Sequence, residues 1–312
     1  MKIYLGITDT HWFEYLRKAK PEDVNFWQPG GHSSFKLLEQ GEPFLFKLKY
    51  PINKIGGVGF FVNHMYLPLS YAWSLFGKNN GCETFSEFES IILHYRREAK
   101  SISSNPVIGC IILTSPVFFE DKDMIPSPDD WSPHIVSGKS YSTDSPIGRD
   151  IWEKIEERFN LYINNKTGGK DILIREPSKN KYGNYITKVR LGQGSFRALV
   201  TDIYDRRCAI SGEKTLPVLE ASHIKPYAES GPHALQNGIL LRSDFHKLFD
   251  TGYLKITKDY HVEVSKRIKD EYENGSEYYK YHGKKLTVIP SKTQNKPSAE
   301  YLSWHNENVF RS

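Results

Sequence analysis

Residues 208–254 read CAISGEKTLPVLEASHIKPYAESGPHALQNGILLRSDFHKLFDTGYL, and their pattern decides the fold of this part of the chain. The apolar run PVLEASHI predicts a strand, and KPYAESGPHALQ, which contains two prolines and a glycine, predicts a loop. GILL then predicts a second strand, and SDFHKLFD predicts a helix that ends before Gly252. The expected order is strand, loop, strand and helix, followed by another short strand.

Three polar side chains occupy defined places in this pattern. His223 ends the first strand, Asn237 begins the second, and His246 lies on the helix. A hairpin packed on a helix would bring all three to one end. An imidazole with a reference pKa of about 6.5 can accept a proton from water, whereas a second imidazole can bind a divalent cation that polarises a phosphate. Asn237 would hold the loop through backbone hydrogen bonds. This layout predicts hydrolysis of a phosphodiester with one metal ion.

The segment resembles an HNH nuclease domain of the ββα-metal type, in the version found in bacterial restriction-type proteins. The resemblance extends upstream through LGQGSFRALVTDIYDRRC and covers about residues 188–255. It implies a metal-dependent DNA endonuclease, with His223 as general base, Asn237 as structural asparagine and His246 as metal ligand. The implied cofactor is one Mg²⁺ or Mn²⁺ ion.

The sequence departs from this family pattern in two places. Many relatives have a metal-binding Asp or His directly before the base, where this chain has Ser222, a poor ligand. Asp250, four residues after His246 on the same helix face, could complete the site, and Asp244 is an alternative. Asp250 could equally end the helix and satisfy a turn. Many relatives also carry two CxxC pairs that bind zinc; here only Cys208 remains, so we expect no structural zinc.

Basic residues surround the motif, and some are expected to contact backbone phosphates, which position DNA without reading its sequence. A solvated charged face is the alternative interpretation. His233, in the loop, is expected to be a loop residue or a phosphate contact. The formal charge of +5, from 42 basic and 37 acidic residues, permits nucleic-acid binding without requiring it. The basic candidates are Arg197, Arg206, Arg207, Lys225 and Arg242.

The length of 312 residues predicts two domains. The strands and helices expected in both parts of the chain predict an α+β fold class. We expect a recognition domain over 1–140, a linker with a helix over 141–190, and the nuclease domain over 191–312. In the first domain, apolar runs predict strands, and the apolar spacing of 83–99 predicts a helix with a capping box at Thr84 and Glu87. Residues 256–312 indicate no function. The predicted strands of the first domain are at 2–7, 42–48, 56–62 and 107–119.

Residues 11–61 resemble the PUA superfamily, and its EVE branch in particular, through an early Trp, an FW element and the runs GEPFLFKL and IGGVGFF. The resemblance implies a small β-barrel with helices that reads a modified base after flipping it from the duplex. We expect Trp27 and Trp73 to be the pocket walls, because aromatic rings stack on bases. The polar candidates are Asn25, His32 and Ser33. A barrel simply filled with aromatic side chains is the alternative.

The composition bounds the environment of the protein. Cys82, Cys110 and Cys208 are few and widely spaced, and we find no apolar run of about 18 residues, so we expect a cytoplasmic protein without a membrane partner. Together the resemblances predict a modification-dependent, type IV-like restriction endonuclease that acts on double-stranded DNA carrying 5-methyl- or 5-hydroxymethylcytosine. A homodimer is plausible. The alternatives are a nuclease that senses phosphorothioate or damage, and a reader whose nuclease half is inactive.

Overall fold

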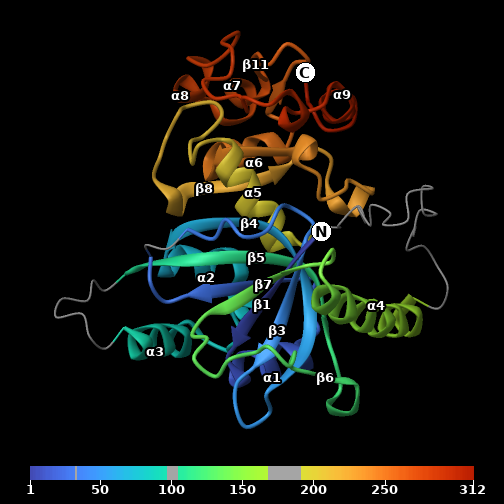
Figure 1. The fold of residues 1–312 in the computed structure, drawn as a ribbon. Helices are drawn as coiled ribbons and strands as arrows, with labels where there is room; N and C mark the ends of the chain where they lie inside the picture. The colour runs from blue at the N-terminus through green and yellow to red at the C-terminus, as the bar shows by residue number, and fades with distance from the viewer. Residues whose placement is uncertain (32–33, 97–104, 168–190) are drawn as a thin grey trace. The chain divides into compact units, whose positions relative to one another are not determined.

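The computed structural model describes residues 1–31, 34–96, 105–167 and 191–312 (Figure 1). The chain divides into two compact units, Met1–Ser195 and Phe196–Ser312. Both units mix helices with strands, which confirms the predicted α+β class. Within the described segments, no helix has both the length and the apolar character needed to cross a bilayer.

The first unit is built on one mixed sheet. Its strands follow the order β2-β5-β4-β3-β1-β7, with β6 paired to β4. β1 and β3 are parallel, and the other pairs are antiparallel. The strands are β1 (Lys2–Thr8), β2 (Asp23–Gln28), β3 (Pro43–Leu48), β4 (Lys54–Pro68), β5 (Val107–Phe118), β6 (Ile125–Pro126) and β7 (Gly138–Ser142).

The glycine-rich part of β4 is irregular in two ways. A Cβ atom at Gly57 would lie 2.3 Å from the carbonyl oxygen of Val117, so the backbones of β4 and β5 approach too closely for a side chain. The pairing of β4 with β5 also shifts register between Val58 and Phe60, as at a β-bulge.

The predicted barrel is not closed. A closed barrel requires its two end strands to pair with each other. Among the described residues, β2 pairs only with β5 and β7 pairs only with β1, so the sheet is open between these ends. Alternation along single strands, which the sequence displays, does not specify the pairing of distant strands.

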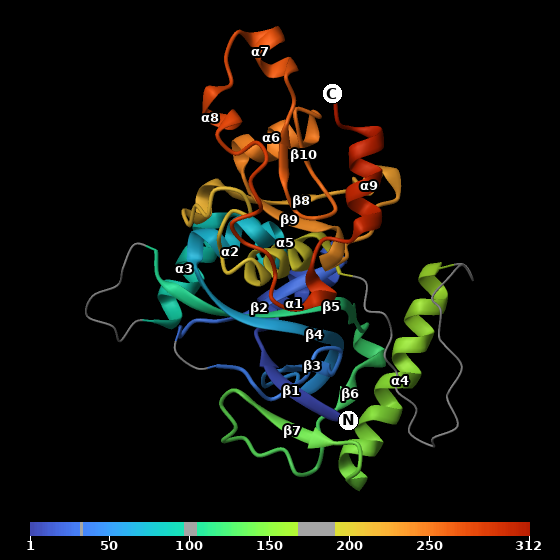
Figure 2. The ribbon, with the colours of Figure 1, turned by 90° about the horizontal axis from the view of Figure 1, so that it is seen from above.

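Helices of the first unit bury the apolar stripes that the sequence displays. Asp9 caps α1 by accepting hydrogen bonds from the backbone N–H groups of His11 and Trp12. Thr84 Oγ1 accepts from the N–H of Glu87 at 3.2 Å and caps α3. α4 packs against β7 and β4 (Figure 2). The helices are α1 (Thr10–Ala19), α2 (Leu69–Phe76), α3 (Phe85–Tyr95) and α4 (Pro146–Thr167), with short 3-10 helices η1 (Gly77–Asn80) and η2 (Asp121–Asp123).

The second unit contains the element order predicted from residues 208–254. β8 (Leu219–His223) pairs antiparallel with β9 (Gly238–Arg242), and α6 (Ser243–Asp250) follows directly. Phe245 and Phe249 are fully buried on the inner face of α6. The remaining helices and strands are α5 (Gln193–Ile203), β10 (Leu254–Ile256), β11 (Val262–Val264), α7 (Arg267–Tyr272), α8 (Ser276–Tyr279) and α9 (Ala299–Asn308). The 3-10 helices are η3 (Leu216–Val218), η4 (Tyr227–Glu229), η5 (Leu235–Asn237) and η6 (Thr293–Asn295).

Candidate active site

The hairpin β8–β9 places His223 opposite Gly238. A Cβ atom at Gly238 would lie 2.5 Å from Cγ2 of Val200 and 3.1 Å from the ring of Phe196. Glycine therefore allows α5 to lie against the end of the hairpin. The ring of Phe196 then stacks on the ring of His223, with centroids 4.0 Å apart and an interplanar angle of 12°. This stacking restricts the orientation of the imidazole.

The imidazole of His223 is partly buried. Nε2 of His223 lies 2.8 Å from Nδ1 of His233. Burial and the nearby His233 and His246 lower the pKa of His223 to about 4, against the opposing effect of Asp250. The ring is therefore neutral at physiological pH and has a lone pair that can accept a proton. The charges of His246 and Asp250 thus act on the same imidazole.

Asn237 fastens the loop between β8 and β9. Its side chain is fully buried. Oδ1 accepts a hydrogen bond from the N–H of Lys225 at 2.8 Å, and Nδ2 donates to the carbonyls of Lys225 at 2.9 Å and Pro232 at 3.0 Å. One carboxamide thus joins the two ends of the loop, and its buried polar atoms are satisfied.

His246 lies on α6 between two carboxylates. Its Nδ1 bonds to the carboxylate of Glu220 on β8, and its Nε2 lies 3.1 Å from Oδ2 of Asp250, one turn further along the helix. Burial disfavours the charged imidazole, but Asp250 and Glu220 outweigh burial and raise the pKa of His246. Sequence reasoning missed Glu220. Its signal was a single carboxylate within the otherwise apolar strand PVLEASHI.

The donor atoms around His246 fit a divalent cation in their chemistry. An imidazole and two carboxylates are ligands that Mg²⁺ and Mn²⁺ accept. In the conformation described here these groups bond to one another, and no set of three or more His, Cys, Asp or Glu in the described residues has the arrangement of a metal site. A cation would therefore have to displace the contact between His246 and Asp250.

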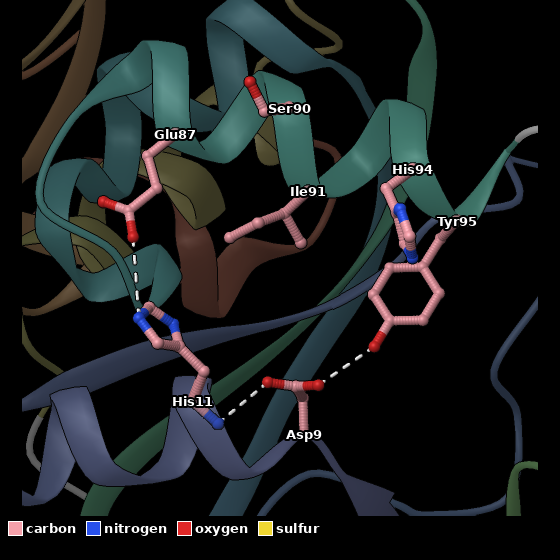
Figure 3. Close-up of a pocket in the computed structure, with 7 residues that line it drawn as sticks. All are labelled: Asp9, His11, Glu87, Ser90, Ile91, His94 and Tyr95. Atoms are coloured by element: carbon pink, nitrogen blue, oxygen red, sulfur yellow. Dashed lines mark hydrogen bonds and ion pairs between the residues drawn. The ribbon is translucent and has the colours of Figure 1, made fainter.

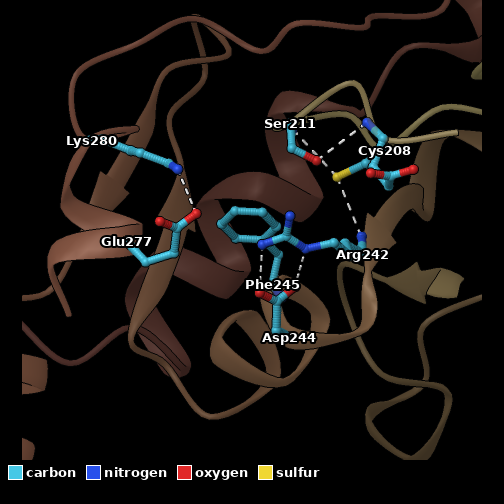
Figure 4. Close-up of polar contacts among 8 residues, drawn as sticks. Cys208, Ser211, Arg242, Asp244, Phe245, Glu277 and Lys280 are labelled. Carbon is cyan, nitrogen blue, oxygen red and sulfur yellow. Dashed lines mark hydrogen bonds and ion pairs between the residues drawn. The ribbon is translucent and has the colours of Figure 1, made fainter. Parts of the chain in front are cut away.

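The other two predicted ligand candidates have other partners. Ser222 is buried, and its hydroxyl donates to the carbonyl of His223 at 3.3 Å. Asp244 accepts hydrogen bonds from Nε and Nη2 of Arg242, each at 2.7 Å (Figure 4). Both groups thus contribute to local structure in the described conformation.

The basic residues near the motif differ in their contacts. The guanidinium of Arg242 packs over the ring of Phe245 at 4.7 Å, and the backbone N–H of Arg242 donates to Sγ of Cys208 at 3.3 Å (Figure 4). Nζ of Lys225 lies 5.4 Å from the ring of Trp304. Nε of Arg207 is buried and has no hydrogen-bond partner in the described part of the chain. Arg197 lies on α5, and Arg206 follows that helix.

The predicted base-pocket residues of the first unit contribute to packing. The rings of Trp27 and Trp73 both contact Phe88, with centroids 6.3 Å and 6.0 Å away. Nε1 of Trp27 donates to the carbonyl of Asn80, and Asn25, which is fully buried, donates to Oδ1 of the same residue. His32 and Ser33 lie outside the described residues.

A pocket of about 400 Å³ lies between the start of α1 and α3 (Figure 3). Asp9 projects into it and accepts a hydrogen bond from the hydroxyl of Tyr95 at 2.9 Å. Burial opposes ionisation of Asp9, but hydrogen bonds from Trp12 and Tyr95 and the charge of Lys49 lower its pKa. The ring of Tyr95 also contacts Trp27 at 5.8 Å, so the pocket borders one predicted wall residue. The lining residues are Asp9, His11, Glu87, Ser90, Ile91, His94 and Tyr95.

Comparisons with solved structures give only distant resemblances. The ASCH protein from Zymomonas mobilis has a TM-score of 0.35 and 9% identity, over 48% of this chain and 94% of that chain. The modification-dependent TagI restriction endonuclease has a TM-score of 0.27 and 12% identity, over 92% of this chain and 75% of that chain. The type IV phosphorothioation-dependent restriction endonuclease ScoMcrA has a TM-score of 0.20 and 14% identity, over 79% and 52%. These values support no argument about fold or function.

The family comparison is more specific. No curated protein matches the chain. A family model described as HNH endonuclease matches residues 208–257, which include β8, β9 and α6. The second unit therefore contains an HNH endonuclease domain, and His223, Asn237 and His246 all lie within it.

Proposed function

We propose that this protein is a divalent-metal-dependent DNA endonuclease that hydrolyses a phosphodiester bond at the β8–β9–α6 site. The observation that carries the proposal is the HNH endonuclease match over 208–257, which includes every proposed catalytic residue. The contact between His246 and Asp250, and the effect of both charges on the pKa of His223, support it further.

In this mechanism, neutral His223 removes a proton from the attacking water. Phe196 fixes the plane of the imidazole, and Asn237 fixes the loop beside it. His246 and Asp250 would hold the divalent cation, and Glu220 would orient His246 through its Nδ1. Mg²⁺ or Mn²⁺ bound there supplies stabilisation of negative charge on the phosphate and the leaving oxygen. One such site cuts one strand, so a double-strand break requires two molecules or two successive events. A homodimer would supply the two molecules.

We propose that Arg197, Arg207, Lys225 and Arg242 bind the DNA backbone. Such contacts release counterions and make binding salt-dependent. The guanidinium of Arg242 is held by Asp244 and Phe245, so it is preorganised for a phosphate. Loss of any one of these four charges would weaken DNA binding by a similar factor for every DNA sequence.

We propose that the first unit reads a modified cytosine, such as 5-methyl- or 5-hydroxymethylcytosine, that is flipped out of double-stranded DNA. The pocket beside α1 supports this, because it combines an aromatic side chain, Tyr95, with the carboxylate of Asp9. A carboxylate accepts a hydrogen bond from the N4 amino group of cytosine, and an aromatic ring can stack on the flipped base. Trp27, in contact with Tyr95, supports the wall.

Cleavage of three matched plasmids tests the proposal: unmodified, 5-methylated and 5-hydroxymethylated, each with Mg²⁺, Mn²⁺ or EDTA. We expect metal-dependent cutting of modified DNA and little cutting of plain DNA. Equal cutting of all three would remove the base-reading role and leave the nuclease. If the protein cuts only phosphorothioate or damaged DNA, then that feature, and not a modified cytosine, is what the first unit recognises. Binding without cutting under any metal would establish a reader with an inactive nuclease half.

A further inference from the structure

His233 forms one side of an aromatic stack around His223, although no role in the proposed hydrolysis has been given to it. The two imidazole centroids are 4.9 Å apart. Phe196 stacks on His223, and Tyr227 stacks on His233 with centroids 4.6 Å apart and an interplanar angle of 12°. Phe196 and Tyr227 thus flank the two imidazoles, which are joined by the hydrogen bond of 2.8 Å between Nε2 of His223 and Nδ1 of His233.

The loop that carries His233 is held in place on both sides of the ring. Nδ2 of Asn237 donates to the carbonyl of Pro232, directly before His233, and the N–H of Ala234 donates to the same carbonyl at 2.8 Å. A Cβ atom at Gly231 would lie 1.9 Å from the carbonyl oxygen of Lys225, so only glycine allows the loop to return this closely. The position of the His233 ring is therefore fixed by its backbone as well as by its stacking.

The hydrogen bond between two neutral imidazoles contains one proton, and its location determines what His223 can do. If Nδ1 of His233 donates, Nε2 of His223 accepts the hydrogen bond with its lone pair. Neutral His223 then carries its own proton on Nδ1 and has no free lone pair for water. If Nε2 of His223 donates, its Nδ1 is deprotonated and can accept a proton from water. The described residues offer Nδ1 of His223 no hydrogen-bond partner. Only the second arrangement supplies a general base.

We propose that His233 is a positioning residue whose Nδ1 accepts a hydrogen bond from Nε2–H of His223 and thereby keeps the Nδ1 lone pair of His223 available for water. This inference rests on the proposed nuclease function. When His223 takes up the proton of water at Nδ1, its Nε2–H becomes a charge-assisted donor to Nδ1 of His233, and this bond strengthens. The loop that Asn237 fastens then serves a second purpose, since it supplies the acceptor for the base.

Three variants of the full chain separate the hydrogen bond from the packing of the ring. His233→Asn retains an acceptor, because the asparagine Oδ1 can reach close to the position of the imidazole Nδ1. His233→Phe retains the ring on Tyr227 but has no acceptor, and His233→Ala removes both. His134→Phe, at an exposed position in the first unit, is the matched control. Thermal unfolding verifies that each variant is folded.

Two measurements decide the proposal. Long-range ¹H–¹⁵N spectra of the histidine rings should show His223 as the Nε2–H tautomer in the wild type and in His233→Asn, with mixed tautomers in His233→Phe. Single-turnover cleavage at saturating enzyme should fall roughly 10–100-fold in His233→Phe and His233→Ala, with DNA affinity unchanged and substantial rescue in His233→Asn. An Nδ1–H tautomer of wild-type His223, or wild-type cleavage by His233→Phe, would overturn the proposal. Absence of wild-type cleavage would refute the nuclease function alone, because the ring spectra still determine the tautomer.

Discussion

Nε2 of His246 lies 3.1 Å from Oδ2 of Asp250, one turn away on the same helix, while Nδ1 of His246 bonds to Glu220 on the neighbouring strand. One imidazole thus joins the helix to the hairpin and presents its second nitrogen beside a carboxylate. The arrangement has consequences for metal binding and for the pH dependence of stability.

We predict that Asp250→Asn weakens Mn²⁺ binding roughly 10–100-fold, because it removes an anionic ligand beside His246. Glu220→Gln should have a smaller effect, since Glu220 acts through Nδ1 of His246. Asp259→Asn, at an exposed turn, is the control. Isothermal titration of the full chain with Mn²⁺ provides the measurement. Equal affinity in the wild type and Asp250→Asn would exclude Asp250 from the metal site.

The depressed pKa of His223 predicts a loss of stability in mild acid. In the unfolded chain, His223 binds a proton near pH 6.5. In the folded protein, it binds the proton only near its pKa of about 4. The contribution of His223 to the free energy of unfolding is present above about pH 6.5 and is lost as the pH falls to about 4.

Urea unfolding of the wild type and His223→Phe between pH 7.5 and 4 measures this contribution. The phenylalanine retains a ring against Phe196 and cannot titrate. We therefore expect a smaller loss of stability on acidification in His223→Phe. Parallel pH curves for the two proteins would show that His223 is not held neutral by the fold.

His246 should behave in the opposite sense. Its raised pKa stabilises the folded protein fully below about pH 6.5, and this contribution is lost as the pH rises through the folded pKa. His246→Asn should remove the alkaline part of the stability profile and change the acidic part less, because burial is the main cause of the lowered pKa of His223 and His246 is only a minor one. The same urea series, extended to pH 9, provides the test. If His246→Asn leaves the alkaline limb unchanged, the two carboxylates do not hold the proton on His246.

Asn237→Ala should destabilise the protein and remove most cleavage. The substitution leaves the N–H of Lys225 and the carbonyls of Lys225 and Pro232 without their partner. Each buried unpaired group costs about 1–3 kcal/mol, so we expect a total of several kcal/mol, reduced by any water that enters. Denaturant unfolding measures the loss, and Asn308→Ala, at an exposed helix position, is the control. A loss below about 0.5 kcal/mol would mean that the loop does not depend on this amide.

Asp9→Asn tests the proposed base pocket with little effect on the helix, because asparagine also caps helices well. The amide presents an N–H group as well as an oxygen, so it can lose the pairing with the amino group of cytosine. Plain cytosine carries the same amino group, but in this proposal only a modified base is held in the pocket. We therefore predict about tenfold weaker binding of modified DNA, equivalent to about 1.4 kcal/mol, with binding of plain DNA unchanged. Fluorescence anisotropy with matched duplexes measures both affinities. Equal weakening on both duplexes would assign Asp9 a role unrelated to the modification.

The sequence predicts the elements of the nuclease site well because they depend on local patterns. The apolar strands around His223 and Asn237 and the amphipathic helix of His246 are confirmed by β8, β9 and α6. A hairpin followed directly by a helix has few ways to pack, so the order of elements largely determines their proximity.

The contacts of His233 and Glu220 could not be predicted in the same way. His233 reaches His223 because of the backbone path through Gly231 and Pro232, and loop conformations are not encoded in a repeating pattern. In the first unit, the sheet is open because β2 and β7, at its two ends, do not pair with each other among the described residues. These strands lie far apart in the sequence, so no local pattern predicts whether they pair. The pocket at Asp9 likewise depends on how α3 meets the start of α1.

Single-turnover cleavage of 5-methylated DNA in Mn²⁺ by the wild type and His223→Ala tests the central claim most directly. The account predicts a loss of about 10²–10⁴-fold in the rate of strand cutting, with the affinity for DNA unchanged. Cutting by His223→Ala at the wild-type rate would contradict the assignment of the base and, with it, the proposed active site.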